Sequence, residues 1–256
     1  MANCRQPLIN WSLLPGALAS GLLVVVALLA FGSLWFFSPS ISIRELFSDH
    51  YLWHVIGFTF WQAFLSALFS ILPAILLARA LYRRRFPGRK LLLQLCAMTL
   101  VLPVLVAVFG ILSVYGKTGW LSQLYQLIGL NYDFSPYGLQ GILLAHVFFN
   151  MPLATRMLLQ SLENISTEQR QIAAQLGLNE WQQFRILEWP YIRRQMLPTA
   201  ALIFMLCFAS FATVLALGGG PAATTIELAI YQALSYDFDP ARAAVLALIQ
   251  LFFVLV

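Results

Sequence analysis

The sequence predicts an all-α integral membrane protein, and two observations support this prediction. Of the 256 residues, 61% are hydrophobic and only 10% are charged, and the mean hydropathy is +0.80. Soluble chains carry about 25% charged residues, so much of this surface is expected to face lipid. The apolar residues also gather in long runs, and a bilayer core about 30 Å thick requires roughly 20 apolar residues in each helical span.

Six apolar runs follow one another along the chain, and the first five are long enough to cross a bilayer as helices. The first run is longer than the apolar region of a secretory signal and lacks a cleavage site, which favours a retained span. The last run reaches only about 21 Å, so the chain is expected to be a fragment that stops inside a span. The expected spans are residues 13–37, 53–81, 91–114, 138–159, 197–217 and 243–256.

The distribution of basic residues predicts the orientation in the membrane. Of the 15 Lys and Arg, all but Arg44, Lys117 and Arg242 fall on one expected side of the bilayer. Cytoplasmic segments carry the excess of basic residues, so this side is expected to be the cytoplasm. It contains the amino terminus and the loops 83–90 and 168–190. The net charge of +5 follows from this topology, and no basic soluble module suggests binding to nucleic acid.

The sequence offers no catalytic or metal-binding motif. Cys4, Cys96 and Cys207 lack the spacing of metal ligands and are interpreted as packing residues. A zinc motif, a GxSxG elbow and a P-loop are all absent from the sequence, so the chain is not expected to be an enzyme, to hydrolyse ATP or to hold a metal or cofactor. Energy for any transport must then come from a partner or from an ion gradient.

The polar stretch 166–190 predicts two short helices between the fourth and fifth spans. Ser166 and Gln169 fit a capping box at the start of the first helix. Gly177 is expected to end that helix in the left-handed conformation, and Asn179 to cap the second helix. Pro190 is expected to stop the second helix, because a proline in a helix interior removes a hydrogen bond.

Both short helices carry apolar residues at helical spacing, which predicts one apolar face on each. Such a pair can lie flat on the membrane surface, or it can form a rigid knob on the cytoplasmic side. The apolar residues are Ile172, Ala173 and Leu176 in the first helix and Trp181, Phe184 and Leu187 in the second.

This loop resembles the EAA loop of permeases in binding-protein-dependent ABC importers. The pattern of that family is Glu-Ala-Ala, three residues, glycine, nine residues and Ile-x-Leu-Pro. The positions that match it here are Gln171, Ile172, Ala173, Gly177, Leu187, Trp189 and Pro190. Gln171 and Ile172 depart from the pattern, whereas Gly177 and Pro190 keep its spacing. The resemblance implies that the loop docks into a groove of a separate ATPase, which uses ATP and magnesium.

Six longer stretches resemble the thiamine importer permeases of Gram-negative bacteria, within the same family of inner-membrane components. These stretches are residues 51–67, 78–89, 95–116, 134–150, 201–221 and 224–244. The resemblance implies a six-span bundle with the type I (MetI-like) ABC importer fold, as the amino-terminal half of a fused two-half permease in the bacterial inner membrane. It also implies alternating access for thiamine and its phosphate esters. The implied partners are an ATPase dimer, a periplasmic thiamine-binding protein, the carboxy-terminal permease half and the lipid bilayer.

Two groups of polar residues are candidates for the pathway or for contact with the binding protein. His146 and Asn150 share one side of the fourth span, where polar groups either hydrogen-bond between helices or line a cavity. On the outer side, acidic and aromatic groups suit the cationic ring of thiamine, although solvated acids are also common in outer loops. This second group comprises Glu227, Tyr231, Tyr236 and Asp237.

Other functions remain open at this stage. A permease for another small solute, such as ferric iron or sulfate, would share the fold and the loop. A gradient-driven secondary transporter would need charged relays inside its spans, and acids are few at membrane depth here. A membrane enzyme would need a cluster of catalytic groups at one membrane face, which the sequence does not offer.

Overall fold

The computed structural model describes residues 14–37, 49–99 and 101–255, and Arg5, Arg44 and Cys4 lie outside this part. The chain divides into two units, which are described separately below. The larger unit is His50–Leu228, and the smaller unit combines Met1–Asp49 with Ala229–Val256. All regular elements among the described residues are helices, as the composition predicts.

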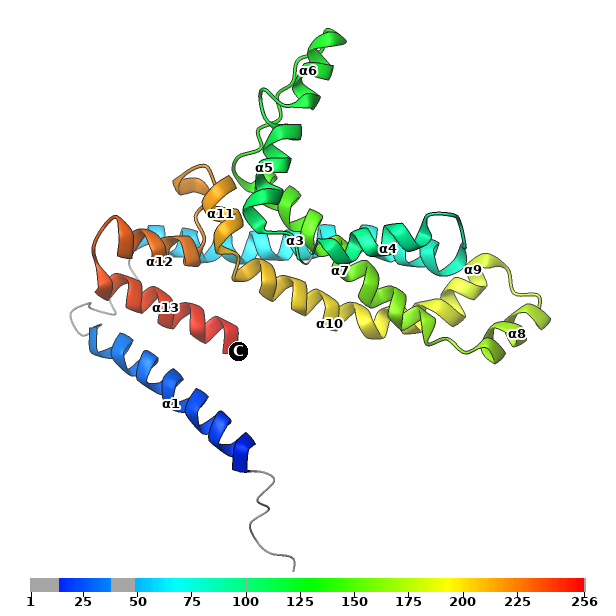
Figure 1. Cartoon of the computed structure of the whole chain (residues 1–256), viewed down its shortest axis with the longest axis horizontal. Helices are drawn as coiled ribbons and strands as arrows, with labels where there is room; N and C mark the ends of the chain where they lie inside the picture. Colours follow the sequence, from blue (N-terminus) through cyan, green and yellow to red (C-terminus); the bar gives the residue numbers. More distant parts are fainter. Residues whose placement is uncertain (1–13, 38–48, 100, 256) are drawn as a thin grey trace, which may run out of the picture. The chain divides into compact units, whose positions relative to one another are not determined.

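Three long helices pack side by side in the larger unit, namely α3 (His50–Arg83), α7 (Leu139–Glu163) and α10 (Trp189–Phe208) (Figure 1). Small residues such as Ala63, Ser66 and Ala74 fill the buried face of α3. Such residues let helix backbones approach closely, which is how helices associate in lipid. Large apolar side chains such as Trp61 and Leu76 are exposed on the same helix, as expected for a surface that faces lipid.

Three helical segments of the described chain are long and apolar enough to cross a membrane: His50–Arg83, Val104–Leu127 and Leu139–Glu163. A fourth crossing results if Glu180–Phe208 and Phe211–Leu217, which meet at an angle of 56°, form one span. Pro15–Val26 and Pro240–Val254 are shorter apolar helices. The second and fourth expected runs therefore correspond closely to single helices.

The third expected run, 91–114, is not one helix, so that prediction is wrong. The chain instead forms α4 (Arg89–Met98) and α5 (Val104–Tyr115), with Pro103 immediately before α5. A proline disfavours helical geometry in the residue before it, which accounts for a break at this position. The apolar segment continues beyond residue 114 through α6 (Trp120–Leu127).

The fifth expected run, 197–217, is likewise divided. Helix α10 ends at Phe208, and α11 (Phe211–Leu217) begins after Ser210, whose backbone is extended. The turn η3 (Pro221–Ala223) and helix α12 (Ile226–Ser235) follow. The backbone N–H of Ile226 donates to Thr59 Oγ1 at 3.0 Å, which ties the start of α12 to α3.

The smaller unit contains α1 (Leu14–Phe37), α13 (Pro240–Leu255) and the part of α12 from Ala229 onward. Helices α1 and α13 contact each other. Asp239 Oδ1 accepts the backbone N–H of Arg242 at 3.0 Å and so caps α13, with Pro240 favoured just after the cap. An Arg242 guanidinium nitrogen also lies 3.2 Å from Asp49 Oδ2.

Candidate functional site

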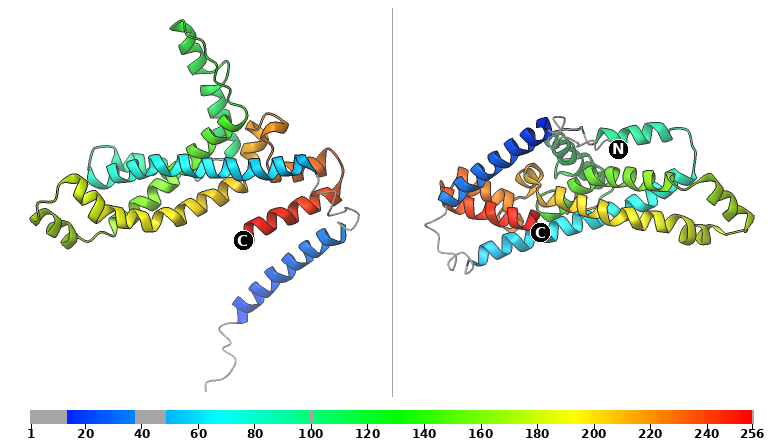
Figure 2. Two further views of the ribbon diagram at one scale, coloured as in Figure 1. Left: turned by 180° about the vertical axis from the view of Figure 1, so that it is seen from behind. Right: turned by 90° about the horizontal axis from the view of Figure 1, so that it is seen from below.

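The loop between α7 and α10 is the candidate site. It comprises α8 (Thr167–Gln175), α9 (Glu180–Gln183) and the π-helical turn η2 (Phe184–Glu188). Two opposite views place this loop at one end of the α3, α7 and α10 bundle (Figures 1 and 2). The loop therefore projects beyond the spans and is accessible to another protein.

Both predicted helix starts are confirmed. Ser166 Oγ accepts the backbone N–H of Gln169 at 3.2 Å, and Gln169 Oε1 accepts the backbone N–H of Ser166 at 3.3 Å. Asn179 and Gln182 form the same reciprocal pair at the start of α9, with both distances 2.9 Å. In the first turn of α8, hydrogen bonds from the Glu168 backbone and the Ser166 side chain lower the pKa of the Glu168 carboxyl. The two caps thus fix where each helix begins.

The predicted end of the first helix is confirmed as well. Gly177 has φ +63°, a left-handed conformation that glycine adopts without steric cost. Its N–H donates to the Ala174 carbonyl at 3.1 Å, and the Leu178 N–H donates to the Ala173 carbonyl at 3.2 Å. This pair of bonds is a Schellman motif, which satisfies two carbonyls at the helix end. The turn at Gly177 sets the direction in which the chain enters α9.

Pro190 does not stop the second helix, so that prediction is wrong. The helix runs without interruption from Glu180 to Phe208, through η2 and into α10. The Trp189 N–H bonds the Phe184 carbonyl, five residues earlier, which widens the turn just before the proline. A π-helical turn is a known way to accommodate a disruption inside a helix. As a result, the loop is rigidly continuous with a membrane helix.

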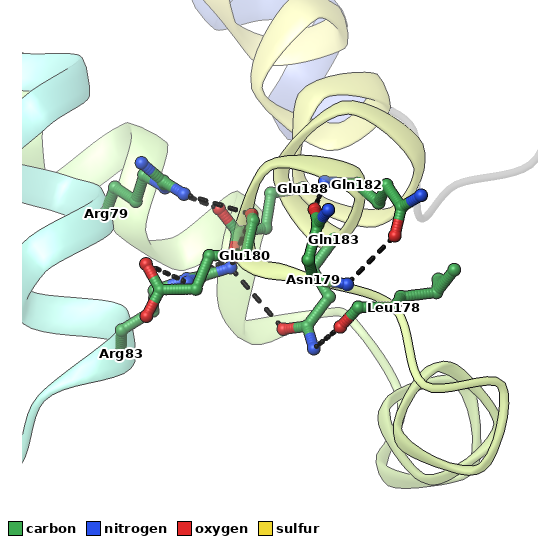
Figure 3. A network of polar contacts seen from close by, with 8 residues as sticks. All are labelled: Arg79, Arg83, Leu178, Asn179, Glu180, Gln182, Gln183 and Glu188. Carbon is green, nitrogen blue, oxygen red and sulfur yellow. Dashed lines mark hydrogen bonds and ion pairs between the residues drawn. The ribbon is translucent and has the colours of Figure 1, made fainter.

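A buried carboxylate fastens this helix to α3. Glu188 is only 2% exposed and accepts from two arginines that lie one helical turn apart. Arg79 Nε donates to Glu188 Oε2 at 2.9 Å, and Arg83 Nε donates to Glu188 Oε1 at 2.6 Å (Figure 3). Hydrogen bonds between ionised groups are stronger than those between neutral groups, and the two bonds together fix the orientation of the Glu188 carboxylate. We call Arg79, Arg83 and Glu188 the arginine clamp.

The arginine clamp also holds α9. The two guanidinium groups donate to the Glu180 carbonyl, at 3.4 Å from Arg79 and 3.3 Å from Arg83. The Arg79 guanidinium also lies over the Phe184 ring, 4.5 Å from its centroid. These contacts add to the bond that the Glu180 carbonyl accepts from the Phe184 N–H, and they place an aromatic ring against a cation. The second half of the loop is therefore anchored at several points.

The first half of the loop has fewer anchors. Arg170 donates to the Ile165 carbonyl at 3.0 Å and lies over the Tyr82 ring at 5.2 Å. Tyr191 Oη bonds Gln169 Oε1 at 3.2 Å, which links α8 to α10. Ala173 is buried, whereas Gln171 is exposed. Helix α8 is thus attached by its first turn and by one small residue.

Four large apolar side chains of the loop face outward. Of the face expected on the first helix, only Ala173 is buried, while Ile172 and Leu176 are exposed, Leu176 by 70%. On the second helix, Trp181 is 66% exposed, whereas Leu187 and Trp189 are half-buried. Ile186 is exposed too. We call Ile172, Leu176, Trp181 and Ile186 the exposed apolar residues of the loop; large exposed apolar side chains are typical of surfaces that bind another protein or a membrane.

His146 and Asn150 are buried among three helices. The His146 ring nitrogens Nδ1 and Nε2 each lie 2.9 Å from a hydroxyl, that of Ser66 on α3 and that of Ser210 before α11. Asn150 Nδ2 donates to Cys207 Sγ at 3.2 Å. These contacts are interhelical hydrogen bonds, one of the two roles that the sequence left open. A role in the pathway stays a prediction.

The acidic and aromatic candidates are divided between the two units. Glu227 is half-buried in the larger unit, whereas Tyr231, Tyr236 and Asp237 belong to the smaller one. The rings of Tyr231 and Tyr236 meet edge to face at 6.0 Å, and Asp237 is exposed. Within the described part of the chain, no group of three or more His, Cys, Asp or Glu could hold a metal ion.

The sequence alone does not predict the arginine clamp. It marks Arg79 and Arg83 only as indicators of orientation and gives no role to Glu188, which lies between two matched positions of the loop pattern. A signal was available, because two arginines four residues apart share one face of a helix. Glu188 lies between the apolar residues Leu187 and Trp189, and a carboxylate buried among apolar side chains needs a basic partner.

Known proteins share both the sequence and the fold. The profile of the family described as "Binding-protein-dependent transport system inner membrane component" matches residues 70–256. The chain is 69% identical over 251 residues to the thiamine transport system permease protein ThiP of Salmonella typhimurium, and 70% identical to that of Escherichia coli. Each alignment covers 98% of this chain and 47% of the relative, so the chain spans about half the length of these relatives.

More distant relatives extend the comparison. The chain is 28% identical to the chloroplastic sulfate permease 2 of Chlamydomonas reinhardtii, over 96% of this chain and 67% of the relative. A crystal structure of a bacterial ABC transporter involved in the import of the acidic polysaccharide alginate matches with a TM-score of 0.80 at 17% identity, over 95% of this chain and 91% of that chain. The helices therefore have the arrangement of an ABC importer permease.

Proposed function

Because the chain belongs to the family of binding-protein-dependent transport system inner-membrane components, we propose that it forms one half of the membrane pathway of an ATP-driven importer. In this proposal, the loop at residues 166–190 docks into a separate ATPase subunit. The permease halves then alternate between inward-open and outward-open states as the ATPase dimer binds and hydrolyses ATP with magnesium. In this proposal the ATPase subunit supplies the nucleotide site, because the sequence contains no P-loop motif.

One observation carries this proposal. The loop has exposed apolar side chains, and it is firmly attached to α3 and α10. Trp181 and Ile186 face outward from the helix that begins at Glu180. In the same helix, Glu188 is held by two arginines of α3. A force applied to these side chains is transmitted directly to α3 through the clamp and to α10 through the continuous backbone. An interfacial helix pair on the membrane surface would not need this anchoring. The geometry thus favours a coupling element over a membrane-surface anchor.

The proposed cargo is thiamine, together with its phosphate esters. The support is an identity of 69–70% with permeases named for thiamine transport, over nearly the whole chain. Sulfate is the second candidate, since the permease at 28% identity is named for sulfate. Ferric iron would share the same fold and loop. A second permease half would complete the pathway, as the length of the relatives suggests.

The proposed location is the bacterial inner membrane, with the loop and the amino terminus in the cytoplasm. Support comes from the basic residues near the loop, among them Arg83, Arg84 and Arg85. The opposite side would then receive the cargo from a periplasmic binding protein. Its proposed contacts include Glu227, Tyr231, Tyr236 and Asp237.

Uptake of labelled thiamine tests the proposal. The full-length permease, its ATPase and its binding protein would be supplied to cells that lack a thiamine importer. The Gly177→Asp variant places a charge at the turn between α8 and α9, beside the exposed apolar residues of the loop. We expect normal insertion in the membrane and loss of uptake in this variant. Uptake that persists without the ATPase would instead support a gradient-driven transporter.

Competition separates the cargoes. Excess unlabelled thiamine should abolish uptake, whereas excess sulfate or ferric iron should not. Normal expression without any thiamine uptake would reject thiamine and leave the importer assignment in place. We call residues 166–190 the coupling loop in this proposal. Co-purification of the ATPase measures whether this loop binds the ATPase, whatever the cargo is.

A further inference from the structure

A groove of about 710 Å³ lies between α4 and α7, on the side of the larger unit that carries the coupling loop. Helix α4 supplies Leu93, Gln94 and Ala97, and α7 supplies residues that include Leu153, Arg156 and Gln160. Its walls are thus mainly apolar, with one guanidinium, one carboxylate and two side-chain amides among them. Neither the expected loop pattern nor the proposed pathway residues involve this groove.

Arg156 is an uncompensated charge in this groove. The hydrogen bonds and ion pairs of the described residues do not include one for its guanidinium. The only other charged residue of the lining, Glu163, is already paired with Arg89 at 3.2 Å. Among the described residues, the guanidinium of Arg156 is therefore the charged group of the lining that has no ion pair.

Arg156 is exposed on α7, a helix that is long and apolar enough to cross a membrane. The residue lies seven positions before the end of α7 at Glu163, which is about 10 Å into the helix at 1.5 Å per residue. A charged side chain on a membrane-spanning helix normally has a partner or reaches a polar cavity. Gln94 and Gln160 offer additional N–H donors on the two facing helices. Three donor groups around apolar walls suit an anion more than a cation.

We infer that the groove between α4 and α7 binds a phosphate group, with Arg156 as its main ligand and Gln94 and Gln160 as secondary donors. Guanidinium matches the oxygens of a phosphate in a two-point contact, and basic pockets between membrane helices on the cytoplasmic side are suited to anionic lipid headgroups. The apolar residues Leu93 and Leu153 would border the rest of the ligand. The phosphate can come from an anionic phospholipid or from a phosphate ester in solution.

Binding measurements on the complete, purified transporter test this inference without relying on transport. The probes are short-chain phosphatidylglycerol, short-chain phosphatidylcholine and inorganic pyrophosphate, with thermal stability in detergent as the readout. We expect saturable stabilisation by phosphatidylglycerol or pyrophosphate, and none by phosphatidylcholine, whose headgroup has no net charge. In Arg156→Gln the binding should be about tenfold weaker, because a charge-assisted two-point contact is lost.

Two further variants make the test specific. Arg156→Lys keeps the charge without the planar fork, so we expect an intermediate loss of affinity and a normally folded protein. Arg194→Gln removes an exposed arginine of α10 outside the groove and should leave binding unchanged. Response to phosphatidylglycerol alone would identify a lipid site, and response to pyrophosphate alone a site for a soluble phosphate ester.

Native mass spectrometry of the transporter extracted from membranes gives a second readout. The unmodified protein should retain more anionic phospholipid than Arg156→Gln if the source is lipid. Absence of binding by both anionic probes, or equal binding by the unmodified protein and Arg156→Gln, would overturn the inference. Both results are independent of whether thiamine is the cargo or the loop binds an ATPase.

Discussion

At the scale of single residues, Glu188 is held more firmly than an exposed carboxylate of the 166–190 loop such as Glu180. Its carboxylate is almost fully buried and is held by Arg79 and Arg83, which are themselves partly exposed. A buried ion pair gains little over an apolar contact, but removal of one partner leaves the other charge uncompensated. Replacing Glu188 is therefore expected to lower the stability by more than the ion pair itself contributes, because Arg79 and Arg83 lose their partner.

Glu188→Gln should lower the free energy of unfolding by about 2 kcal/mol, less than the 3–5 kcal/mol of a fully buried pair, because both arginines reach solvent. Thermal unfolding in detergent measures this loss. Glu180→Gln is the matched control, since its carboxylate is 90% exposed and lies 3.5 Å from Arg83. A similar loss in both variants would contradict the special role of the buried carboxylate.

Gly177 tests the cost of the left-handed turn. Gly177→Ala should destabilise the loop by about 1 kcal/mol, because a Cβ disfavours φ near +63°. Gly177→Asn should cost less, since asparagine tolerates this conformation. No heavy atom lies within 4 Å of the added Cβ, so the effect comes from the backbone alone. Hydrogen exchange of the Gly177 and Leu178 amides would report it, and equal protection in all three proteins would contradict the prediction.

At the scale of elements, the second half of the loop is an extension of α10 rather than a separate short helix. The second short helix, the π-helical turn and the membrane helix form one continuous rod from Glu180 to Phe208. Helix α8 packs beside this rod by its first turn. Displacement of the exposed apolar residues of the loop is then expected to move α10 as a unit.

Trp181→Ser should weaken binding of the ATPase while leaving the thermal stability of the permease nearly unchanged. The side chain is 66% exposed, so its removal costs the folded chain little, whereas exposed aromatic residues commonly dominate protein interfaces. Co-purification of the ATPase measures the effect. Trp61→Ser, in which an exposed tryptophan of α3 is changed, is the control and should retain the ATPase.

At the scale of the whole molecule, the chain combines membrane helices with a polar loop at one end of its larger unit. The proposed topology puts this loop in the cytoplasm and the segment between α6 and α7 on the opposite side. The two sides can be distinguished chemically, because the native Cys96 and Cys207 are buried. Introduced cysteines at exposed positions therefore report the topology.

In a background with Cys4 replaced by serine, Gln175→Cys should react with a membrane-impermeant thiol reagent only after the membrane is opened. Tyr137→Cys, at an exposed position before α7, should react in intact spheroplasts. Both expectations follow from the excess of basic residues near the loop. Labelling of residue 175 in intact spheroplasts would reverse the proposed orientation.

Local signals in the sequence were sufficient for the parts of the fold that depend on neighbouring residues. Apolar runs predicted helices corresponding to α3 and α7, and the caps at Ser166 and Asn179 and the turn at Gly177 lie where their patterns place them. Each of these features depends on residues within one or two turns. The loop pattern also led to the correct family, because spacing between glycine and proline is a property of the linear chain.

The sequence by itself thus determined the class of protein, the starts of both short loop helices, the end of the first one at Gly177, and the family. Only the tertiary structure decided that Pro190 lies inside a continuous helix and that Glu188 is clamped by Arg79 and Arg83. The physical reason is distance along the chain. A proline can be absorbed by a widened turn, and a carboxylate can be neutralised by arginines more than 100 residues away, only when packing brings the partners together.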